Sequence, residues 1–272
     1  MPYRLLKPQI FAPGIEVIRE MDALNEEYLD KIATKAAEQL ISPDYIPKIS
    51  AYTYLRNLVG RAIGRSIRLP DYRYFWTTAV MADGLIEYHK STKKRNMLMV
   101  LKEYHLRNSR KPSHFEITYV DEAMNALSVL ELYRLSKEDW AEEKVEIFSD
   151  FLLKLHPKTC DGVLPYRSYN NEIVLIDTLG MVCPFLCHYY LEFGNKASIE
   201  LAVNQIVQYI KKGFSSDSGL PYHGYNARTS ETLGGDGWGR GLGWFLMGLS
   251  EVLISLPEDD RRYTELLTNY RN

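Results

Sequence analysis

The chain has 272 residues, enough to bury a large core as one domain or two. Its 46% hydrophobic and 25% charged residues are typical of a globular protein, and the net charge of −2 gives no electrostatic signature of nucleic-acid binding. Three cysteines imply no disulfide framework, no residue set has metal-ligand spacing, and no cofactor is expected. The N-terminus lacks a signal-peptide pattern, and the longest apolar run, 173–193, contains Asp177 and Pro184, so we expect a cytoplasmic protein without a membrane partner.

Helical periodicity recurs along nearly the whole chain. In the first predicted helix, 24–41, Leu29, Ile32, Ala36 and Leu40 share one face. Further helices are predicted at 49–66, 74–90, 92–107, 117–135, 138–155, 173–193, 197–213 and 238–256, and a last one begins near Pro257. Sustained period-two alternation is missing from the sequence, which predicts an all-α protein with low strand content.

The predicted helices alternate in character. Those at 24–41, 92–107, 138–155 and 197–213 have a polar face, as in Glu142–Lys144, whereas those at 74–90, 117–135, 173–193 and 238–256 are apolar enough to be buried. Buried helices alternating with half-exposed helices indicate a toroid with an inner and an outer ring of helices, and a linear solenoid is the alternative. The long loops 156–172 and 214–237 favour the toroid, because loops of this length tend to carry function. We interpret 1–272 as a single toroid domain of about five hairpins whose C-terminal hairpins are missing, leaving an open seam that favours self-association.

Two loops are near copies of each other. Residues 161–170 and 217–226 are identical at six of ten positions, including Leu-Pro-Tyr in both, and Asp217 follows Asp161 by 56 residues. The same spacing separates Asp121 from Asp177. A fixed period of this size indicates a repeated supersecondary unit. Asp121 and Asp177 are therefore expected at equivalent positions of successive inner helices, facing one pocket.

Each carboxylate also has a purely structural interpretation. Asp121 could simply interact with a helix dipole, and Asp177 could be a structural acid that is hydrogen-bonded inside its apolar run. Two carboxyls in one pocket suit acid and base catalysis on a sugar. His223 follows the second Leu-Pro-Tyr at the same end of the repeat, where a catalytic role and a structural role are both open.

The segment Gly237–Trp244 carries four alternating glycines. It does not match a dinucleotide loop, because Leu242 stands where a glycine is required. Each glycine in a helix costs about 1 kcal/mol relative to alanine, so close helix approach or a ligand must offset that cost. Arg240 and Trp244 lie one turn apart, and an arginine fork binds carboxylates, either on a substrate or on one of the two acids.

These motifs resemble a known family. Residues 177–181, 184–186, 222–224 and 238–244, in this order and spacing, resemble the unsaturated rhamnogalacturonyl hydrolases of glycoside hydrolase family 105, which are related to the unsaturated glucuronyl hydrolases of family 88. The resemblance covers residues 70–256. It implies an (α/α)6 toroid of six hairpins and removal of a 4,5-unsaturated galacturonic acid from rhamnogalacturonan fragments during pectin degradation, by protonation and hydration of the sugar's double bond.

The resemblance also implies residue roles. Asp177 would be the general acid and base, and Asp121 the second carboxylate, holding sugar hydroxyls or assisting water. The sugar would be bound by His223, Trp238, Arg240, Trp244, Met181, Tyr166 and Trp76. Two alternatives remain open: a helical-repeat binding module derived from such an enzyme but inactive, and another toroid enzyme such as an epimerase, which would need paired histidines.

Overall fold

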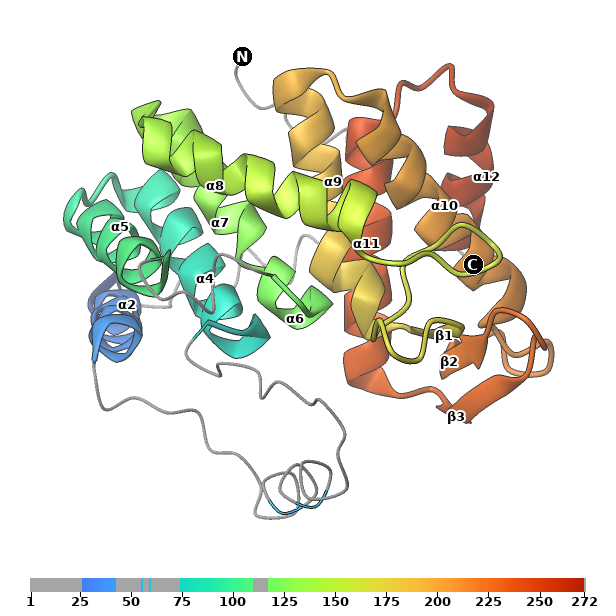
Figure 1. Ribbon diagram of the computed structural model, residues 1–272. Coiled ribbons are helices and arrows are strands. Elements are labelled where there is room, and N and C mark those ends of the chain that lie inside the picture. Colours follow the sequence, from blue (N-terminus) through green and yellow to red (C-terminus); the bar gives the residue numbers. More distant parts are fainter. Residues whose placement is uncertain (1–25, 43–54, 56–58, 60–73, 110–116, 272) are drawn as a thin grey trace. The chain divides into compact units, whose positions relative to one another are not determined.

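The computed structural model describes residues 26–42, 74–109 and 117–271, together with Leu55 and Val59 (Figure 1). Two compact units divide these residues: one spans Ala36–Phe151, and the other contains Leu152–Asn272 and the helix residues before Ala36. That 1–272 forms a single domain stays a prediction. Helix α2, Glu26–Ile41, matches the first predicted helix, whereas the predicted helix 49–66 lies almost wholly outside the described residues.

The unit Ala36–Phe151 is built from helices. They are α4 (Trp76–Thr92), α5 (Asn96–Ser109), α6 (Val120–Ala123), α7 (Ala126–Ser136) and α8 (Asp139–Asp150), the last followed directly by a π-helical segment, Phe151–Leu155. The apolar side chains of Leu101, Val129, Leu130, Val145 and Phe148 are fully buried in it. Each such side chain contributes about 1.5–3 kcal/mol by leaving water.

The predicted helix 117–135 is broken in the structure, and Asn125 explains the break. Its side-chain amide donates to the carbonyl of Glu122 at 3.1 Å, and its Oδ1 accepts from the hydroxyl of Tyr104 at 2.8 Å. A buried asparagine that bonds the backbone locally competes with regular helix hydrogen bonds. The chain therefore turns at Met124–Asn125 between α6 and α7.

The second unit packs four helices side by side (Figure 1). They are α9 (Asp177–Phe193), α10 (Lys196–Lys212), α11 (Gly239–Ser255) and α12 (Arg261–Arg271). Helix α9 is buried on all sides from Asp177 to Cys187, as its apolar composition predicts. The residues that fill the space between these helices include Val182, Leu186, Ile206, Leu249, Val252 and Leu253.

A small antiparallel sheet is formed by one strand that precedes α9 and two strands that precede α11. Its strands are β1 (Ile173–Leu175), β2 (Tyr222–Asn226) and β3 (Thr232–Asp236), in the order β1-β2-β3. Leu175 pairs with Gly224, so the end of β1 lies beside the middle of β2. Strand content is low, as predicted, but residues 173–175 were expected to be helical and form β1 instead. The first long loop, 156–172, leads into β1, and the second, 214–237, contains β2 and β3. The candidate site lies beside this sheet.

Candidate functional site

Asp177 is the first residue of α9. Strand β1 runs into this helix through Ile176, and the backbone N–H of Ile176 donates to the carbonyl of His223 at 3.0 Å. Asp177 is 8% exposed, and its carboxylate lies where the helix dipole favours a negative charge. The strand-to-helix junction therefore fixes a nearly buried carboxyl beside strand β2.

His223 is the partner of Asp177. Its Nε2 lies 3.4 Å from Asp177 Oδ2, and the histidine side chain is 44% exposed whereas the aspartate side chain is 11% exposed. This separation is longer than a good hydrogen bond. Hydrogen bonds between catalytic groups are often this long in enzymes without substrate and shorten when substrate binds. The exposed imidazole can pass a proton between solvent and the covered carboxyl.

An aromatic ring and a cation extend this pair. Trp238 precedes α11 and meets the His223 ring edge to face, with 4.7 Å between ring centroids. The guanidinium of Arg240 lies 4.5 Å from the centre of the Trp238 ring. Asp177, His223, Trp238 and Arg240 thus form a continuous row of acid, imidazole, indole and guanidinium.

Strand β2 is anchored from α10. The hydroxyl of Tyr209 donates to the carbonyl of Tyr222 at 2.8 Å. Burial raises the pKa of Tyr209, and electrostatic interactions with Tyr225 and with the Asp177 carboxylate raise it further. Tyr209 is not predicted from the sequence, because a tyrosine inside an amphipathic helix carries no signal of its contacts.

The glycines of α9 and α11 allow close helix approach. A Cβ at Gly180 would lie 2.9 Å from the carbonyl oxygen of Trp244, and a Cβ at Gly241 would lie 2.9 Å from Ile176 Cγ2 and 2.6 Å from Trp238 Cε3. A Cβ atom with contacts below 3.0 Å would overpack the core and force the two helices apart. Two glycines therefore let the helix that carries Asp177 touch the helix that follows Trp238.

Three other predicted sugar-binding residues lie in this unit. Met181 is 3% exposed and Trp244 8% exposed, so both lie within the packing around α9 and α11. Tyr166 is half-buried, and the guanidinium of Arg167 lies 3.8 Å from its ring centre. The backbone N–H of Tyr166 donates to the carbonyl of Ile173, which joins its loop to β1. Sugar contact by these residues stays a prediction.

Asp121 and Trp76 belong to the other unit. Asp121 lies in α6 and is fully buried, and Trp76 is the first residue of α4 and is half-buried. That Asp121 shares a pocket with Asp177 stays a prediction.

The sequence decides the family. The sequence profile of Glycosyl Hydrolase Family 88 matches residues 57–272. The chain belongs to glycosyl hydrolase family 88. No protein of curated function gives a significant sequence match.

Solved structures show the fold of this family 88 chain. A glycoside hydrolase of family 105 from C. acetobutylicum is 21% identical, with a TM-score of 0.66, and the match covers 80% of this chain and 63% of that one. A possible family 105 member from Klebsiella pneumoniae is 17% identical, with a TM-score of 0.73, covering 99% and 68%. A family 88 hydrolase from Bacteroides vulgatus is 16% identical, with a TM-score of 0.54, covering 89% and 66%.

The solved structures confirm the predicted fold class, the α/α toroid, and the profile match confirms the predicted relationship to family 88. The chain spans 63% of the length of the C. acetobutylicum protein. The part of the family 88 chain that the structure describes contains no cluster of three His, Cys, Asp or Glu side chains able to hold a metal. None of its described helices is long and apolar enough to cross a membrane.

Lys144 corrects one expectation from the sequence. It was assigned to a polar helix face, but it is 3% exposed, and its ammonium lies 5.7 Å from the ring centre of Tyr74 and 5.5 Å from that of Phe148. Burial lowers its pKa to about 8, and Glu122 and Glu143 oppose this shift. Lys144 of this family 88 chain is therefore a buried cation beside two aromatic rings.

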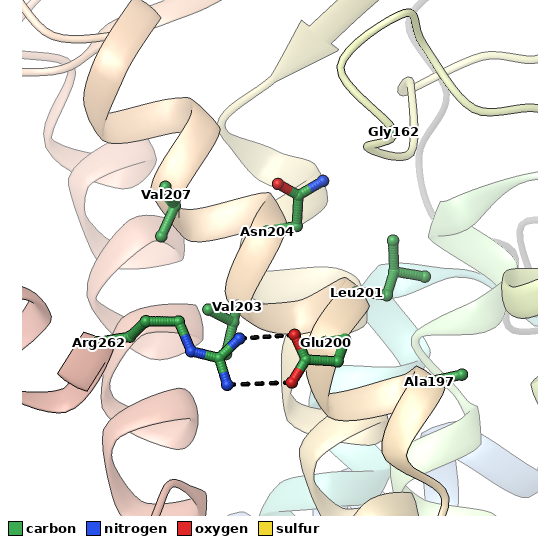
Figure 2. Close-up of a pocket in the computed structure, with 8 residues that line it drawn as sticks. All are labelled: Gly162, Ala197, Glu200, Leu201, Val203, Asn204, Val207 and Arg262. Atoms are coloured by element: carbon green, nitrogen blue, oxygen red, sulfur yellow. Dashed lines mark hydrogen bonds and ion pairs between the residues drawn. The ribbon is translucent and has the colours of Figure 1, made fainter. Parts of the chain in front are cut away.

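A hollow of about 520 Å³ lies along α10 (Figure 2). It is lined by Gly162, Ala197, Glu200, Leu201, Val203, Asn204, Val207 and Arg262. Arg262 holds Glu200 with two hydrogen bonds, at 2.6 and 3.0 Å, so the charged groups of the hollow satisfy each other. None of the predicted site residues lines it, and we place the candidate site at the Asp177–His223 pair instead.

Proposed function

We propose that this chain removes a 4,5-unsaturated galacturonic acid from rhamnogalacturonan oligosaccharides by hydrating the sugar's double bond. The observation that carries the proposal is the nearly buried Asp177 carboxyl, 3.4 Å from the exposed His223 imidazole and continued by Trp238 and Arg240. Family 88 membership supports a hydrolase, and the choice of substrate follows from the motif resemblance described above.

In the proposed reaction, the Asp177 carboxyl donates its proton to C4 of the vinyl-ether double bond. Water then forms a bond to C5 and gives up a proton to the Asp177 carboxylate, which restores the acid. The resulting C5 hemiketal opens by breaking its bond to the ring oxygen, which leaves a ketone at C5 and a hemiacetal at C1. The hemiacetal then breaks its bond to the aglycone oxygen and releases the rest of the oligosaccharide as an alcohol. A positioned acid of this kind contributes about 10²–10⁴-fold to a rate. His223 supports the cycle because its exposed ring can return a lost proton to Asp177.

Trp238 and Arg240 supply the proposed recognition of the uronic acid. An indole offers a flat apolar face for a sugar ring, and a guanidinium binds a carboxylate through two parallel hydrogen bonds. The stacking of Arg240 on Trp238 places both groups beside the catalytic pair. We assign the uronate carboxylate to Arg240, and the sugar hydroxyls or the attacking water to Asp121.

The test is incubation of the chain with an unsaturated rhamnogalacturonan disaccharide, following the ultraviolet absorbance of the double bond. The matched control is the saturated disaccharide, which has no double bond to hydrate. Loss of absorbance together with release of the aglycone supports the proposal. Binding without turnover, measured by calorimetry, would support the inactive binding module instead, and neither binding nor turnover would overturn the substrate assignment.

A further inference from the structure

Strands β2 and β3 slip out of register beside His223. Tyr222 pairs with Asp236 and Gly224 pairs with Leu233, so two steps along β2 face three steps along β3. The extra residue of β3 lies in the Gly234–Gly235 segment, directly opposite His223. A bulge of this kind bends the strand and re-aims a neighbouring side chain.

The absence of a side chain at Gly234 makes room for the side chain of His223. Its φ is +74°, and a Cβ built on it would lie 2.9 Å from His223 Cβ and 3.7 Å from His223 Cγ and Nδ1. His223 Cβ is fixed to the strand and cannot rotate away, so a side chain at position 234 would push the histidine or the strand. Gly235 differs, because a Cβ there would meet nothing within 4 Å.

Three further contacts hold the His223 residue. Its ring meets Trp238 edge to face, its Nε2 faces Asp177, and its carbonyl accepts from the N–H of Ile176. A push from Gly234 that displaces His223 therefore changes the distance of its ring to Trp238 or to Asp177.

We propose that Gly234 is a positioning residue, and that the β3 bulge uses its missing side chain and left-handed backbone to set the imidazole of His223 against Trp238 and Asp177. The catalytic consequence rests on the function proposed above, whereas the effect on His223 geometry does not. A displacement of about 1 Å at a reacting group can cost about 100-fold in rate.

The chain offers two control glycines for the test. Gly219 has a φ of +68° with nothing within 4 Å of its Cβ position, so Gly219→Ala introduces backbone strain without a collision. Gly235→Ala introduces no collision and no left-handed strain. Gly234→Ala introduces both, and Gly234→Asn keeps the collision with less strain, because asparagine tolerates the left-handed region.

The primary measurement is the nuclear Overhauser contact between the ring protons of His223 and Trp238 in each full-length variant. We expect it to be lost in Gly234→Ala and Gly234→Asn and kept in Gly219→Ala and Gly235→Ala. On the unsaturated disaccharide, kcat is expected to fall about 10- to 100-fold in the two Gly234 variants, with KM changed less than about threefold. In the unsubstituted chain, the α-protons of Gly234 should contact the β-protons of His223.

Retention of the His223–Trp238 contact in the Gly234 variants would overturn the proposal, as would loss of that contact in Gly219→Ala. Absence of the Gly234–His223 contact in the unsubstituted chain would also overturn it, even where a Gly234 variant does not fold. If the unsubstituted chain turns over no unsaturated disaccharide but the contacts behave as expected, the proposed function fails and the positioning role stands.

Discussion

His223 Nε2 lies 3.4 Å from Asp177 Oδ2, although one residue belongs to strand β2 and the other begins helix α9. The hydrogen bond from Ile176 N–H to the His223 carbonyl, 3.0 Å long, holds these two elements together at the point where the side chains meet. A covered carboxyl and an exposed imidazole in this arrangement can share one proton with solvent, which is the basis of the next prediction.

Replacement of His223 by glutamine should lower kcat on the unsaturated disaccharide by about 10- to 100-fold, because Asp177 loses the exposed imidazole that replaces a proton lost to solvent. His188→Gln is the matched control: His188 pairs with Glu251 at 3.0 Å between α9 and α11, outside the site. Steady-state kinetics of both variants check this. Equal loss in the two variants would show that His223 acts only through packing.

Arg240→Gln should raise KM by about 10- to 100-fold with little change in kcat, because a charge-assisted hydrogen bond to the substrate carboxylate contributes about 1.5–3 kcal/mol. Arg228→Gln is the control, since Arg228 is exposed and pairs with Glu172 at 2.7 Å. Initial rates against substrate concentration separate the two constants. An unchanged KM in Arg240→Gln or in Arg240→Glu would remove Arg240 from uronate recognition.

Gly180→Ala should lower the free energy of unfolding by about 1–3 kcal/mol, because its Cβ would overpack the contact of α9 with Trp244. Gly243→Ala should be neutral or stabilise α11 by up to about 1 kcal/mol, since a Cβ there meets nothing within 4 Å. Urea unfolding of the two variants is the measurement. A Gly180→Ala chain as stable as Gly243→Ala would contradict the close helix approach.

His105 should make the unit Ala36–Phe151 acid-sensitive. Its nitrogens contact Tyr74 at 3.1 Å and Ser128 at 3.0 Å, and burial, followed by the charge of Lys144, lowers its pKa from 6.5 to about 3. Below pH 6.5, His105 binds a proton in the unfolded chain but stays neutral in the folded chain. The free energy of unfolding therefore decreases as the pH falls from 6.5 toward 3.

The loss amounts to about 1.4 kcal/mol per pH unit, or about 2 kcal/mol between pH 7 and pH 5. In His105→Gln this part of the slope should vanish, although the variant starts from lower stability. Lys144, with a pKa of about 8, changes little in this range. Urea unfolding at the two pH values decides: an identical slope in both chains would mean that His105 is not buried as a neutral ring.

Much of the helical framework follows from the sequence. The predicted helices 197–213 and 238–256 are found as Lys196–Lys212 and Gly239–Ser255, because strong apolar periodicity specifies long helices well. The break at Asn125 could not be predicted, since it depends on Tyr104, a residue distant in sequence. Strand β1 could not be predicted, because a short apolar run is compatible with both a buried strand and a buried helix.

The site was partly predictable. The duplicated loops singled out His223, and the apolar run around Asp177 marked an unusual carboxylate, but no sequence pattern gives the distance between them. The glycine run indicated close packing, and the structure confirms this for Gly241. The role of Gly234 depends on the shift in register between β2 and β3, and the burial of Lys144 depends on packing against the Tyr74 ring. Neither feature could be inferred from the local sequence pattern.

The most direct test of the account is the turnover number of Asp177→Asn on the unsaturated disaccharide, measured by loss of double-bond absorbance, beside Asp217→Asn, an exposed aspartate of the second duplicated loop. We predict that Asp177→Asn folds normally and loses at least about 10²-fold in kcat, while Asp217→Asn keeps the rate of the unsubstituted chain. A folded Asp177→Asn chain that retains more than about a tenth of the original kcat would contradict the assignment of Asp177 as the acid.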